Sequence, residues 1–359
     1  MTLQAERLRS RLLAEGVSLL VIPTNPQAPA GFGLLHRIPV LRTVIREAQY
    51  LFSLCRLFYR RVAVVHHLSA SGLYFFLHSA PVLMLARIAG KRAILNYRGG
   101  RAADFLRAWS WLVVPLMRLA DQVAVPSEFL QRVFASYGIS SVLLPNIAEG
   151  GLFSFCERKA FSPRLLVTRN LEPMYNLECV LRAFRIVQTQ CPEAVLGVVG
   201  SGSQEARLRH LVDELRLAGV TFYGAVRNQD LPAIYAQHDI YVNASSVDNF
   251  PGALVEAACS GLVIVTTRAG GIPDMLPDRE RALLVPLNDH EALAQGALEC
   301  LRNQQFAHKL AQAAHVWAGQ FSWANVFPRL MECYGMAGSL PQVPPREEAI
   351  SLLESSEVR

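Results

Sequence analysis

Short apolar runs alternate with longer amphipathic stretches along the whole chain. Such alternation is typical of parallel sheets whose faces are covered by helices. Five runs in the first half predict strands, at 17–22, 62–65, 92–97, 122–126 and 141–145. Six more follow in the second half, at 164–168, 195–200, 220–224, 240–243, 263–267 and 283–286. The pattern therefore predicts an α/β protein with two Rossmann-like, doubly wound parallel sheets that face each other across a cleft.

The length of 359 residues suits two domains of ordinary size. A stretch with two glycines, a charge cluster and a proline, residues 149–163, marks the predicted junction. The chain begins on a helix-like segment, so we expect the first strand of the N-terminal domain to be missing. The predicted parts are an N-terminal acceptor domain at 1–158, a C-terminal nucleotide-sugar domain at 159–320, a closing helix at 321–337 that returns to the first domain, and a mobile tail at 338–359.

Composition excludes several classes of protein. Hydrophobic residues make up 52% of the chain, which favours a well-packed fold over disorder. No stretch has the roughly 18 uncharged apolar residues that a membrane-spanning helix needs, and residues 72–90 predict a buried or interfacial helix instead. The N-terminus has no signal-peptide layout, so we predict a cytoplasmic location. The seven cysteines include no C-x-x-C pair, which disfavours a disulfide framework and a structural zinc site.

Charge is divided unevenly between the two halves. Residues 1–160 carry 19 Lys and Arg against 8 Asp and Glu, whereas residues 161–359 carry 16 against 21. A basic first half indicates an anionic partner. Arg42, Arg46, Arg56 and Arg60 repeat at helical spacing within residues 37–61. We consider two interpretations: a packed helix with a solvated basic face, or an interfacial helix that meets anionic lipid or a lipid-diphosphate acceptor.

The most informative motif is D-N-F-P-G-A-L-V-E, which runs from Asp248 to Glu256. It follows a predicted strand, and Pro251 suits the first turn of the next helix. The N–H groups of that turn form an anion site strengthened by the helix dipole. Two carboxylates beside this turn could flank a sugar nucleotide. Taken alone, they could equally be a helix cap and a surface glutamate.

The run D-N-F-P-G-A-L-V-E-A-A-C-S-G resembles the E-G-F-G-x-x-x-x-E-A-M-A-x-G signature of family 4 retaining glycosyltransferases. That family belongs to the GT-B superfamily and includes the glycogen-synthase-like group. R-L-L-V-T-R-N-L-E-P-M-Y-N resembles the family's V-G-R-L-x-x-x-K-G segment, and V-V-G-S-G resembles its G-x-G turn. T-T-R-A-G-G-I-P-D resembles its G-G-x-P-E loop. The likeness is nearly continuous over residues 164–334 and looser before them.

The resemblance implies three catalytic residues. Glu256 would bind the ribose hydroxyls, Asp248 the hydroxyls of the transferred sugar, and Arg169 the diphosphate. No metal or other cofactor is implied, because arginine and a helix N-terminus can stabilise the departing diphosphate. The donor-binding residues that it implies are Gly200, Gly202, Gly224, Val226, Asn249, Phe250, Pro251, Gly252, Gly270 and Gly271.

The chain departs from the family pattern at two further places. The family's diphosphate lysine has no counterpart, since Met174 and Tyr175 stand at its position. Where many members have a histidine, this chain has N-Y-R-G-G. The acceptor-side candidates are therefore His66, His67, Tyr97, Arg98, Gly99 and Gly100. For the two histidines, satisfaction by the local backbone is an equal alternative.

These features predict a hexosyltransferase that moves a sugar from a nucleoside-diphosphate sugar to a cell-envelope or exopolysaccharide acceptor, with retention of configuration. Its expected partners are the nucleotide sugar, a glycan or lipid-linked acceptor, and an anionic membrane surface met by the basic half, which would make it peripheral on the membrane's inner face. A nucleic-acid role has no recognition motif behind it. The alternative is a catalytically impaired GT-B-like scaffold or partner protein.

Overall fold

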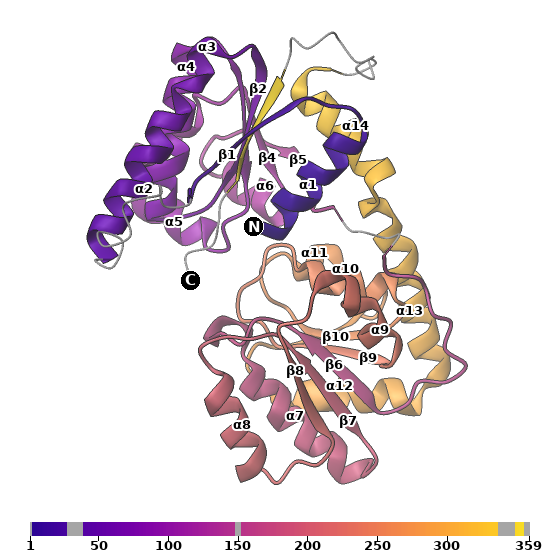
Figure 1. The fold of residues 1–359 in the computed structure, drawn as a ribbon. Helices are drawn as coiled ribbons and strands as arrows, with labels where there is room; N and C mark the ends of the chain where they lie inside the picture. The colour runs from indigo at the N-terminus through magenta and orange to yellow at the C-terminus, as the bar shows by residue number, and fades with distance from the viewer. Residues whose placement is uncertain (1, 27–38, 148–151, 337–348, 355–359) are drawn as a thin grey trace. The chain divides into compact units, whose positions relative to one another are not determined.

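The computed structural model describes residues 2–26, 39–147, 152–336 and 349–354. The chain divides into two compact units, shown in Figure 1. Unit 1 comprises Met1–Ile147 and Trp323–Arg359, and unit 2 comprises Ala148–Ser322. Each unit contains one six-stranded sheet in which all neighbouring strands are parallel. The prediction of two doubly wound α/β domains is therefore confirmed.

The sheet of unit 1 has the strand order β1-β12-β2-β3-β4-β5. Its strands are β1 (Leu19–Pro23), β2 (Val62–Ser69), β3 (Arg92–Tyr97), β4 (Gln122–Val125), β5 (Val142–Leu143) and β12 (Ala349–Glu354). The central strands are buried on both faces, and seven of the eight residues of β2 are buried. Helices must therefore cover both faces of this sheet.

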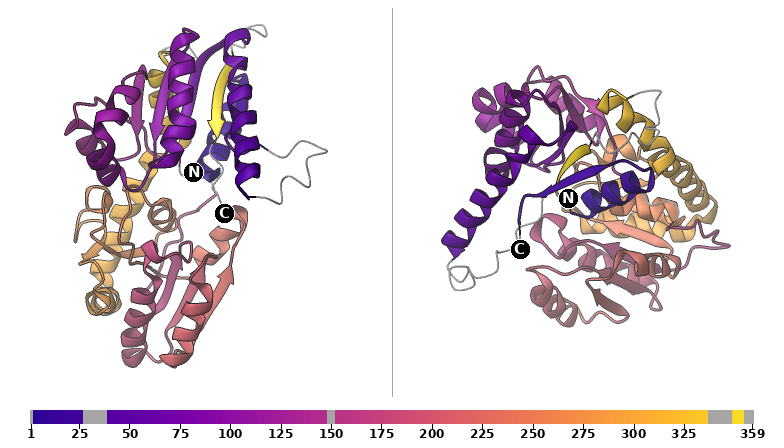
Figure 2. Two further views of the ribbon diagram at one scale, coloured as in Figure 1. Left: turned by 90° about the vertical axis from the view of Figure 1, so that its left-hand side faces the viewer. Right: turned by 45° about the horizontal axis from the view of Figure 1, so that its top comes forward.

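The helices of unit 1 form two layers, one on each side of the sheet (Figures 1 and 2). On one face α2 (Pro39–Leu54), α3 (Arg56–Tyr59), α4 (Ala80–Ile88), α5 (Ala102–Met117) and α6 (Glu128–Ala135) build a core. A π-helical turn, Phe75–Ser79, leads into α4. On the other face, α1 (Thr2–Ala14) and α14 (Trp323–Tyr334) pack against β2, β3 and β4.

Strand β12 corrects two expectations about unit 1. It lies between β1 and β2, with Leu19 opposite Ile350 and His66 opposite Leu352. Residues 349–354, expected in a mobile tail, thus supply an inner strand of the sheet (Figure 2, yellow). This sheet, which we expected to lack its first strand, includes a strand that comes from the C-terminal side of the chain. The physical reason is that β1 and β2 each have an edge whose N–H and C=O groups need partners, and the apolar run A-I-S-L-L-E supplies them.

The sheet of unit 2 has the strand order β11-β10-β9-β6-β7-β8. Its strands are β6 (Arg164–Thr168), β7 (Val195–Val199), β8 (Val220–Gly224), β9 (Ile240–Asn243), β10 (Val263–Thr267) and β11 (Leu283–Val285). The chain reverses direction of winding between β6 and β9. Ligands of doubly wound sheets bind at such a switch point, beyond the carboxyl ends of the strands.

Helices also cover both faces of the second sheet. One face packs against α7 (Leu177–Gln190), α8 (Glu205–Glu214) and α12 (His290–Arg302). The other packs against α9 (Leu231–Ala236), α10 (Gly252–Cys259), α11 (Ile272–Met275) and the end of α13 (Gln304–Ala318). Within the described part of the chain, no helix is both long and apolar enough to span a bilayer.

The described part of the predicted junction is held by Arg158, which is only 7% exposed. Its guanidinium pairs with Asp239 at 2.9 Å and donates to the carbonyls of Cys156, Ser260 and His238. This arrangement fixes residues 156–162 against unit 2. Residues 148–151 of the junction lie outside the described residues.

Candidate functional site

Arg169 and Asp248 lie side by side at the switch point of unit 2. Arg169 directly follows β6, and Asp248 lies in the loop after β9. The Arg169 Nη2 atom is 3.0 Å from Asp248 Oδ2, with side chains 9% and 13% exposed. Burial is the largest single influence on the pKa of Arg169 and would lower it, but Asp248 together with Tyr241, Tyr175 and Tyr235 outweighs burial and raises that pKa. Burial raises the pKa of Asp248, and Arg169 limits the rise.

Asn243, which the sequence analysis did not name, fixes the orientation of the Arg169 guanidinium. It ends β9, is fully buried, and its Oδ1 accepts a hydrogen bond of 3.1 Å from Arg169 Nε. Its Nδ2 donates to Thr266 Oγ1 on the neighbouring strand β10. Tyr175 adds its ring, 5.3 Å from the Arg169 guanidinium carbon. A polar residue that ends a wholly buried strand was the available sequence signal for Asn243.

The loop after β10 holds the main chain of Asp248. The Gly271 N–H donates to the Asp248 carbonyl at 2.9 Å. Gly270 has φ +51°, and a Cβ there would lie 2.1 Å from the same carbonyl oxygen. Only glycine fits such a close approach. The two glycines therefore position the loop that carries Asp248, a role that sequence analysis did not assign to them.

Gly200 and Gly202 serve the loop that carries Arg169. A Cβ on Gly200, whose φ is +133°, would lie 2.0 Å from the Arg169 carbonyl oxygen. A Cβ on Gly202 would lie 2.6 Å from the Leu171 carbonyl oxygen. We expected these glycines to let the protein backbone approach the donor closely. In the structure, the groups that approach these glycines closely are carbonyls of the chain's own backbone.

The turn after β8 places Gly224 beside Gly200. The Gly224 carbonyl accepts a hydrogen bond of 2.8 Å from the Gly200 N–H, and Gly224 has φ +69°. Val226 is half-buried against the core that includes α9 and α10. The base-binding role expected of this turn stays a prediction.

Helix α10 begins where the sequence predicts, with Pro251 as its N-cap and no side-chain cap bond. Nothing lies within 4 Å of the position that a Cβ on Gly252 would take, so this first turn is open. Asn249 and Phe250 are buried, and the Phe250 ring packs edge-on against Phe321. The Phe250 ring thus anchors the loop in the core, and its assignment as a donor contact stays a prediction.

Glu256 lies inside α10 and is 8% exposed. The Tyr235 hydroxyl donates to Glu256 Oε2 at 3.1 Å and is 2.6 Å from Thr168 Oγ1. The Tyr241 hydroxyl is 3.1 Å from the same Thr168 oxygen. Because Thr168 precedes Arg169, this chain of hydroxyls links the backbone of the arginine to the predicted ribose-binding carboxylate. Tyr235 carried no motif signal in the sequence, and Thr168 lies within a quoted motif but was assigned no role.

Most acceptor-side candidates of unit 1 lie inside the fold. His66, His67 and Tyr97 are fully buried. His66 Nδ1 is 2.7 Å from the Tyr334 hydroxyl, and His67 Nε2 is 2.9 Å from Ser79 Oγ. Burial lowers the pKa of each histidine to about 3, so both are neutral. Both histidines are bonded to side-chain hydroxyls rather than to the local backbone, and His67 Nδ1 has no partner among the described residues. Their complete burial argues against their assignment as ligand contacts.

Tyr97 is corrected in the same way, because its hydroxyl is bonded to Ser71 Oγ at 2.6 Å. Gly99 is buried, whereas Gly100 is exposed and has open space where a Cβ would stand. Arg98 remains the charged candidate at the carboxyl end of β3.

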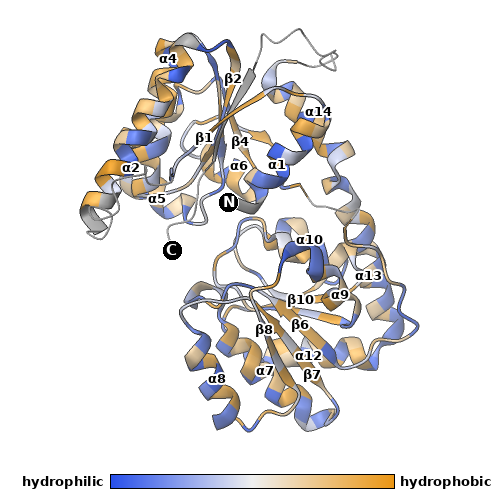
Figure 3. Ribbon diagram, in the orientation of Figure 1, coloured by the Kyte–Doolittle hydropathy of each residue, from blue (hydrophilic) through white to orange (hydrophobic). Residues whose placement is uncertain are grey.

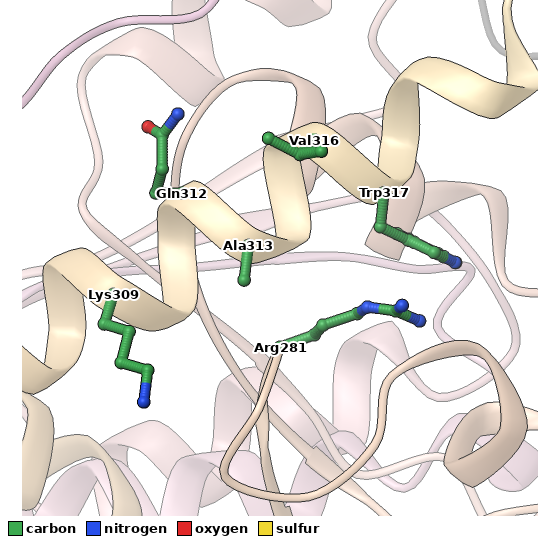
Figure 4. A pocket seen from close by; sticks show the side chains of 6 residues that line it. All are labelled: Arg281, Lys309, Gln312, Ala313, Val316 and Trp317. Carbon is green, nitrogen blue, oxygen red and sulfur yellow. The ribbon is translucent and has the colours of Figure 1, made fainter.

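Unit 2 also has a hollow beside α13 (Figure 4). It is lined by Arg281, Lys309, Gln312, Ala313, Val316 and Trp317, none of which the sequence marked as a site residue. The described residues also contain no group of three His, Cys, Asp or Glu side chains arranged to hold a metal ion. The expected lack of a metal requirement stays a prediction.

The family model of group 1 glycosyl transferases matches residues 158–317, which include the whole arrangement around Arg169, Asp248 and Glu256. Among curated proteins, the chain is similar to the sulfoquinovosyl transferase SQD2 of Arabidopsis thaliana. That relative is 24% identical over 72% of this chain, and the match spans 53% of its own length.

A second relative is the GDP-mannose-dependent alpha-(1-6)-phosphatidylinositol monomannoside mannosyltransferase of Mycolicibacterium smegmatis. It is 26% identical, and the match covers 71% of this chain and 74% of the relative. The corresponding mannosyltransferase of Mycobacterium tuberculosis is 23% identical over 76% of this chain and 77% of its own length.

Solved structures show the same fold. The Anabaena protein HepE in complex with UDP superposes with a TM-score of 0.67 over 86% of this chain and 90% of HepE, at 18% identity. The pneumococcal O-GlcNAc transferase GtfA, bound to UDP and GlcNAc, has a TM-score of 0.67 over 81% of this chain and 60% of its own, at 16% identity. The chain therefore has the GT-B fold, and its residues 158–317 match the family of group 1 glycosyl transferases.

Proposed function

We propose that the chain transfers a hexose from a nucleoside-diphosphate sugar to a cell-envelope or exopolysaccharide acceptor, with retention of configuration. The observation that carries the proposal is the assembly at the switch point of unit 2. There the buried guanidinium of Arg169 follows β6, and the carboxylate of Asp248 follows the neighbouring strand β9. Helix α10 begins shortly after Asp248 and has no side-chain cap. The family of the matching segment, a group of glycosyl transferases, supports the same conclusion.

Each residue then has a distinct role. Arg169 binds the diphosphate, because its planar fork matches phosphate oxygens and Asn243 already fixes its orientation. The open first turn of α10 adds main-chain N–H groups to the same anion. Glu256, held by Tyr235, accepts hydrogen bonds from the ribose hydroxyls. Asp248 accepts them from the transferred sugar.

The proposed reaction needs no protein nucleophile. The acceptor attacks on the face that the diphosphate leaves, and the departing phosphate accepts the acceptor's proton. Arg169 and the α10 N-terminus stabilise the charge that develops on the leaving group, which is the largest contribution a preorganised site can make. Tyr175 stands where the family has a lysine, and its ring faces Arg169. The site therefore relies on one side-chain cation.

Calorimetry on the full chain with UDP, GDP, ADP and dTDP tests this function. We expect saturable binding of at least one nucleotide. Glu256→Ala should weaken that binding about tenfold, the loss of roughly one charge-assisted hydrogen bond. Arg268→Met is the matched control, because Arg268 also follows a strand of this sheet but is exposed and pairs with Asp278. Absence of binding by every nucleotide would instead support the alternative of an inactive partner protein.

We further propose that the acceptor is lipid-linked and that unit 1 docks on an anionic membrane surface. Many large apolar side chains on the outer helices of unit 1 are exposed (Figure 3 shows hydrophobic positions along α2 and α4). They include Val44, Leu51, Phe52, Phe58, Leu73, Leu77, Met84, Ile88, Trp109 and Trp111. Exposed arginines accompany them at positions 56, 60, 61 and 87. Apolar side chains, tryptophans and arginines on one set of helices are typical of an interfacial surface. The names of the two mycobacterial relatives contain phosphatidylinositol, which agrees with a lipid acceptor.

Flotation with phosphatidylserine-containing vesicles, compared with neutral phosphatidylcholine vesicles, tests the docking. Binding should need the anionic lipid and fall at high salt, because arginine attraction is screened. Ile88→Ser should reduce it about threefold to tenfold through lost apolar burial. Val316→Ser in unit 2 is the matched control, since Ile88 and Val316 are both 70% exposed. Equal effects of the two variants, or equal binding to both vesicles, would contradict the proposal.

A further inference from the structure

Arg98 directly follows β3, and its main chain is held on three sides. Its N–H donates to the Ser69 carbonyl at 2.9 Å. Before it, the buried Tyr97 hydroxyl is bonded to Ser71 Oγ. After it, Gly99 packs so closely that a Cβ would lie 2.5 Å from Ser71 Oγ and 2.7 Å from the Ser71 nitrogen. The guanidinium is therefore presented from a rigid backbone, as a preorganised binding group requires.

The guanidinium of Arg98 has binding capacity that the fold does not use. Its Nε and Nη1 atoms are buried, and neither has a hydrogen-bond partner in the described part of the chain. No ion pair joins Arg98 to a described carboxylate. Burial lowers its pKa to about 10. By contrast, the buried Arg158 has Asp239 and several carbonyls as partners.

Asn96 lies two residues earlier on β3, so it faces the same side of the sheet as Arg98. It is fully buried, and its Nδ2 donates to His66 Nε2 at 3.0 Å. This bond makes His66 Nε2 the acceptor and its Nδ1 the donor to Tyr334. The Asn96 Oδ1 atom has no partner among the described residues. Unused donors on Arg98 thus occur together with an unused acceptor on Asn96.

The surroundings of these groups favour an anion. His66, the titratable neighbour on this face, is neutral because burial and the nearby Arg98 charge lower its pKa to about 3. It therefore neither repels nor competes for a bound anion. An unpaired buried charge costs folding free energy, so its presence indicates a compensating ligand. A carboxylate has no proton to offer Asn96, whereas a phosphate ester, with a second pKa near 6, offers a P–OH as well as anionic oxygens.

We infer that Arg98 and Asn96 form a phosphate-binding site in unit 1 that takes the phosphate group of the acceptor substrate. The inference rests on the proposed function and adds to it the chemistry of the acceptor: a phosphorylated molecule such as a prenyl phosphate. Arg98 and Asn96 belong to unit 1, whereas Arg169 belongs to unit 2. Arg98 supplies the charge-assisted donors and Asn96 the acceptor that distinguishes a protonated phosphate oxygen.

Titration of the full chain with inorganic phosphate, followed by calorimetry, measures this site directly. The Arg169→Met background removes the phosphate-binding arginine of unit 2 and isolates unit 1. In that background, phosphate binding should persist, and Arg98→Met should weaken it between about tenfold and a hundredfold. Arg101→Met should leave it within about twofold, because Arg101 is an exposed arginine three residues away. Retained binding in Arg98→Met, or loss in Arg169→Met alone, overturns the site.

A second measurement assigns the phosphate to its source. In the otherwise unaltered chain, Arg98→Met should leave the Kd for the bound nucleoside diphosphate within about twofold. It should weaken binding of a short-chain prenyl phosphate at least about tenfold. A weakened nucleotide Kd would mean that Arg98 serves the donor, which overturns the acceptor assignment. Failure of every nucleotide to bind the unaltered chain would refute the proposed function, while the phosphate titration would still judge the site. Thermal unfolding of Arg98→Met shows that the variant is folded.

Discussion

The two units handle a buried arginine at a strand end in opposite ways. In unit 2, Arg169 is neutralised by Asp248, bonded to Asn243 and covered by the Tyr175 ring. In unit 1, two nitrogens of Arg98 are buried with no partner in the described part of the chain. Accordingly, the pKa of Arg169 is raised and that of Arg98 is lowered to about 10.

The difference teaches what each site requires of its ligand. A diphosphate entering unit 2 must compete with Asp248 for the guanidinium, so binding there exchanges one anion for another. A phosphate entering unit 1 meets a cation that has no counter-ion, so binding there removes an existing cost. The first site is stable when empty and selective when filled. The second lowers the stability of the empty fold in favour of affinity.

Arg169→Met is expected to have the largest effect. It removes the proposed diphosphate contact and leaves Asp248 buried without its cation, so the variant should lose about 3–5 kcal/mol of stability and at least a hundredfold in turnover. Hydrogen exchange of β6 and β9 peptides measures the stability of unit 2 by itself. Arg268→Met, whose pair is half exposed, should change stability by less than about 1 kcal/mol. Equal effects of the two variants would contradict the prediction that the buried Arg169–Asp248 pair matters more than the half-exposed pair of Arg268.

Arg98→Met should change the stability of the fold in the opposite direction, because it should stabilise unit 1. The pKa of Arg98 is lowered from 12.5 to about 10, so the charged form is disfavoured by folding on the order of 3 kcal/mol at any pH below 10. That cost declines as the pH rises from 10 towards 12.5. The variant should therefore stabilise unit 1, by up to about 3 kcal/mol at pH 7.5, as measured by exchange of β3 and β4 peptides. Destabilisation by more than about 1 kcal/mol would show that the guanidinium makes contacts that hold the empty fold.

The sequence predicted the strand pattern and the motif series of unit 2 well, because both are local. The start of α10 after Pro251 is one example. It could not predict that Arg169 pairs with Asp248, since 79 residues separate them and only the order of strands brings them together. Strand β12 was missed for the same reason, as its partners lie at least 286 positions earlier (Ile350 opposite Val64, 350 − 64 = 286).

Burial of the histidines was missed for a different physical reason. In a parallel sheet covered on both faces, hydrophobic alternation is lost, so the pattern does not show which side chains point inward. His66 and His67 occupy successive positions of β2, and each is buried under a different helical layer with its own hydroxyl partner. The glycine motifs correctly indicated that another group approaches the backbone closely at these positions. The approaching groups are carbonyls of the chain itself, whereas we had expected the donor.

The buried histidines give unit 1 a steeper acid sensitivity. The unfolded chain takes up protons near pH 6.5, whereas folded His66 and His67 resist protonation until about pH 3. Their contribution to stability is therefore complete above pH 6.5 and falls as the pH drops from there towards 3, by up to about 1.4 kcal/mol per pH unit for each histidine. Unit 2 has one comparable residue, His238, whose pKa is also lowered by burial. Exchange measured between pH 7 and 5 should show β2 and β3 losing protection before β6 and β9, and His66→Gln should reduce that slope. A steeper loss in unit 2 would reverse the comparison.

The smallest effect is expected for Tyr235→Phe, which probes how far the polar network of unit 2 supports its ligand site. The change removes one hydroxyl that donates to Glu256 and bonds to Thr168, while the ring keeps its stacking on Tyr241. We expect a loss of about 1 kcal/mol in stability and a threefold to tenfold weaker nucleotide Kd. Tyr241→Phe is the matched control, because its hydroxyl bonds to Thr168 but has no bond to Glu256 in the described structure. If nucleotide affinity falls equally in both variants, the hydroxyls act through Thr168 and the position of Arg169. If it falls only in Tyr235→Phe, Glu256 depends on this hydroxyl for its orientation, and unit 2 is preorganised at the ribose end as well as at the diphosphate end.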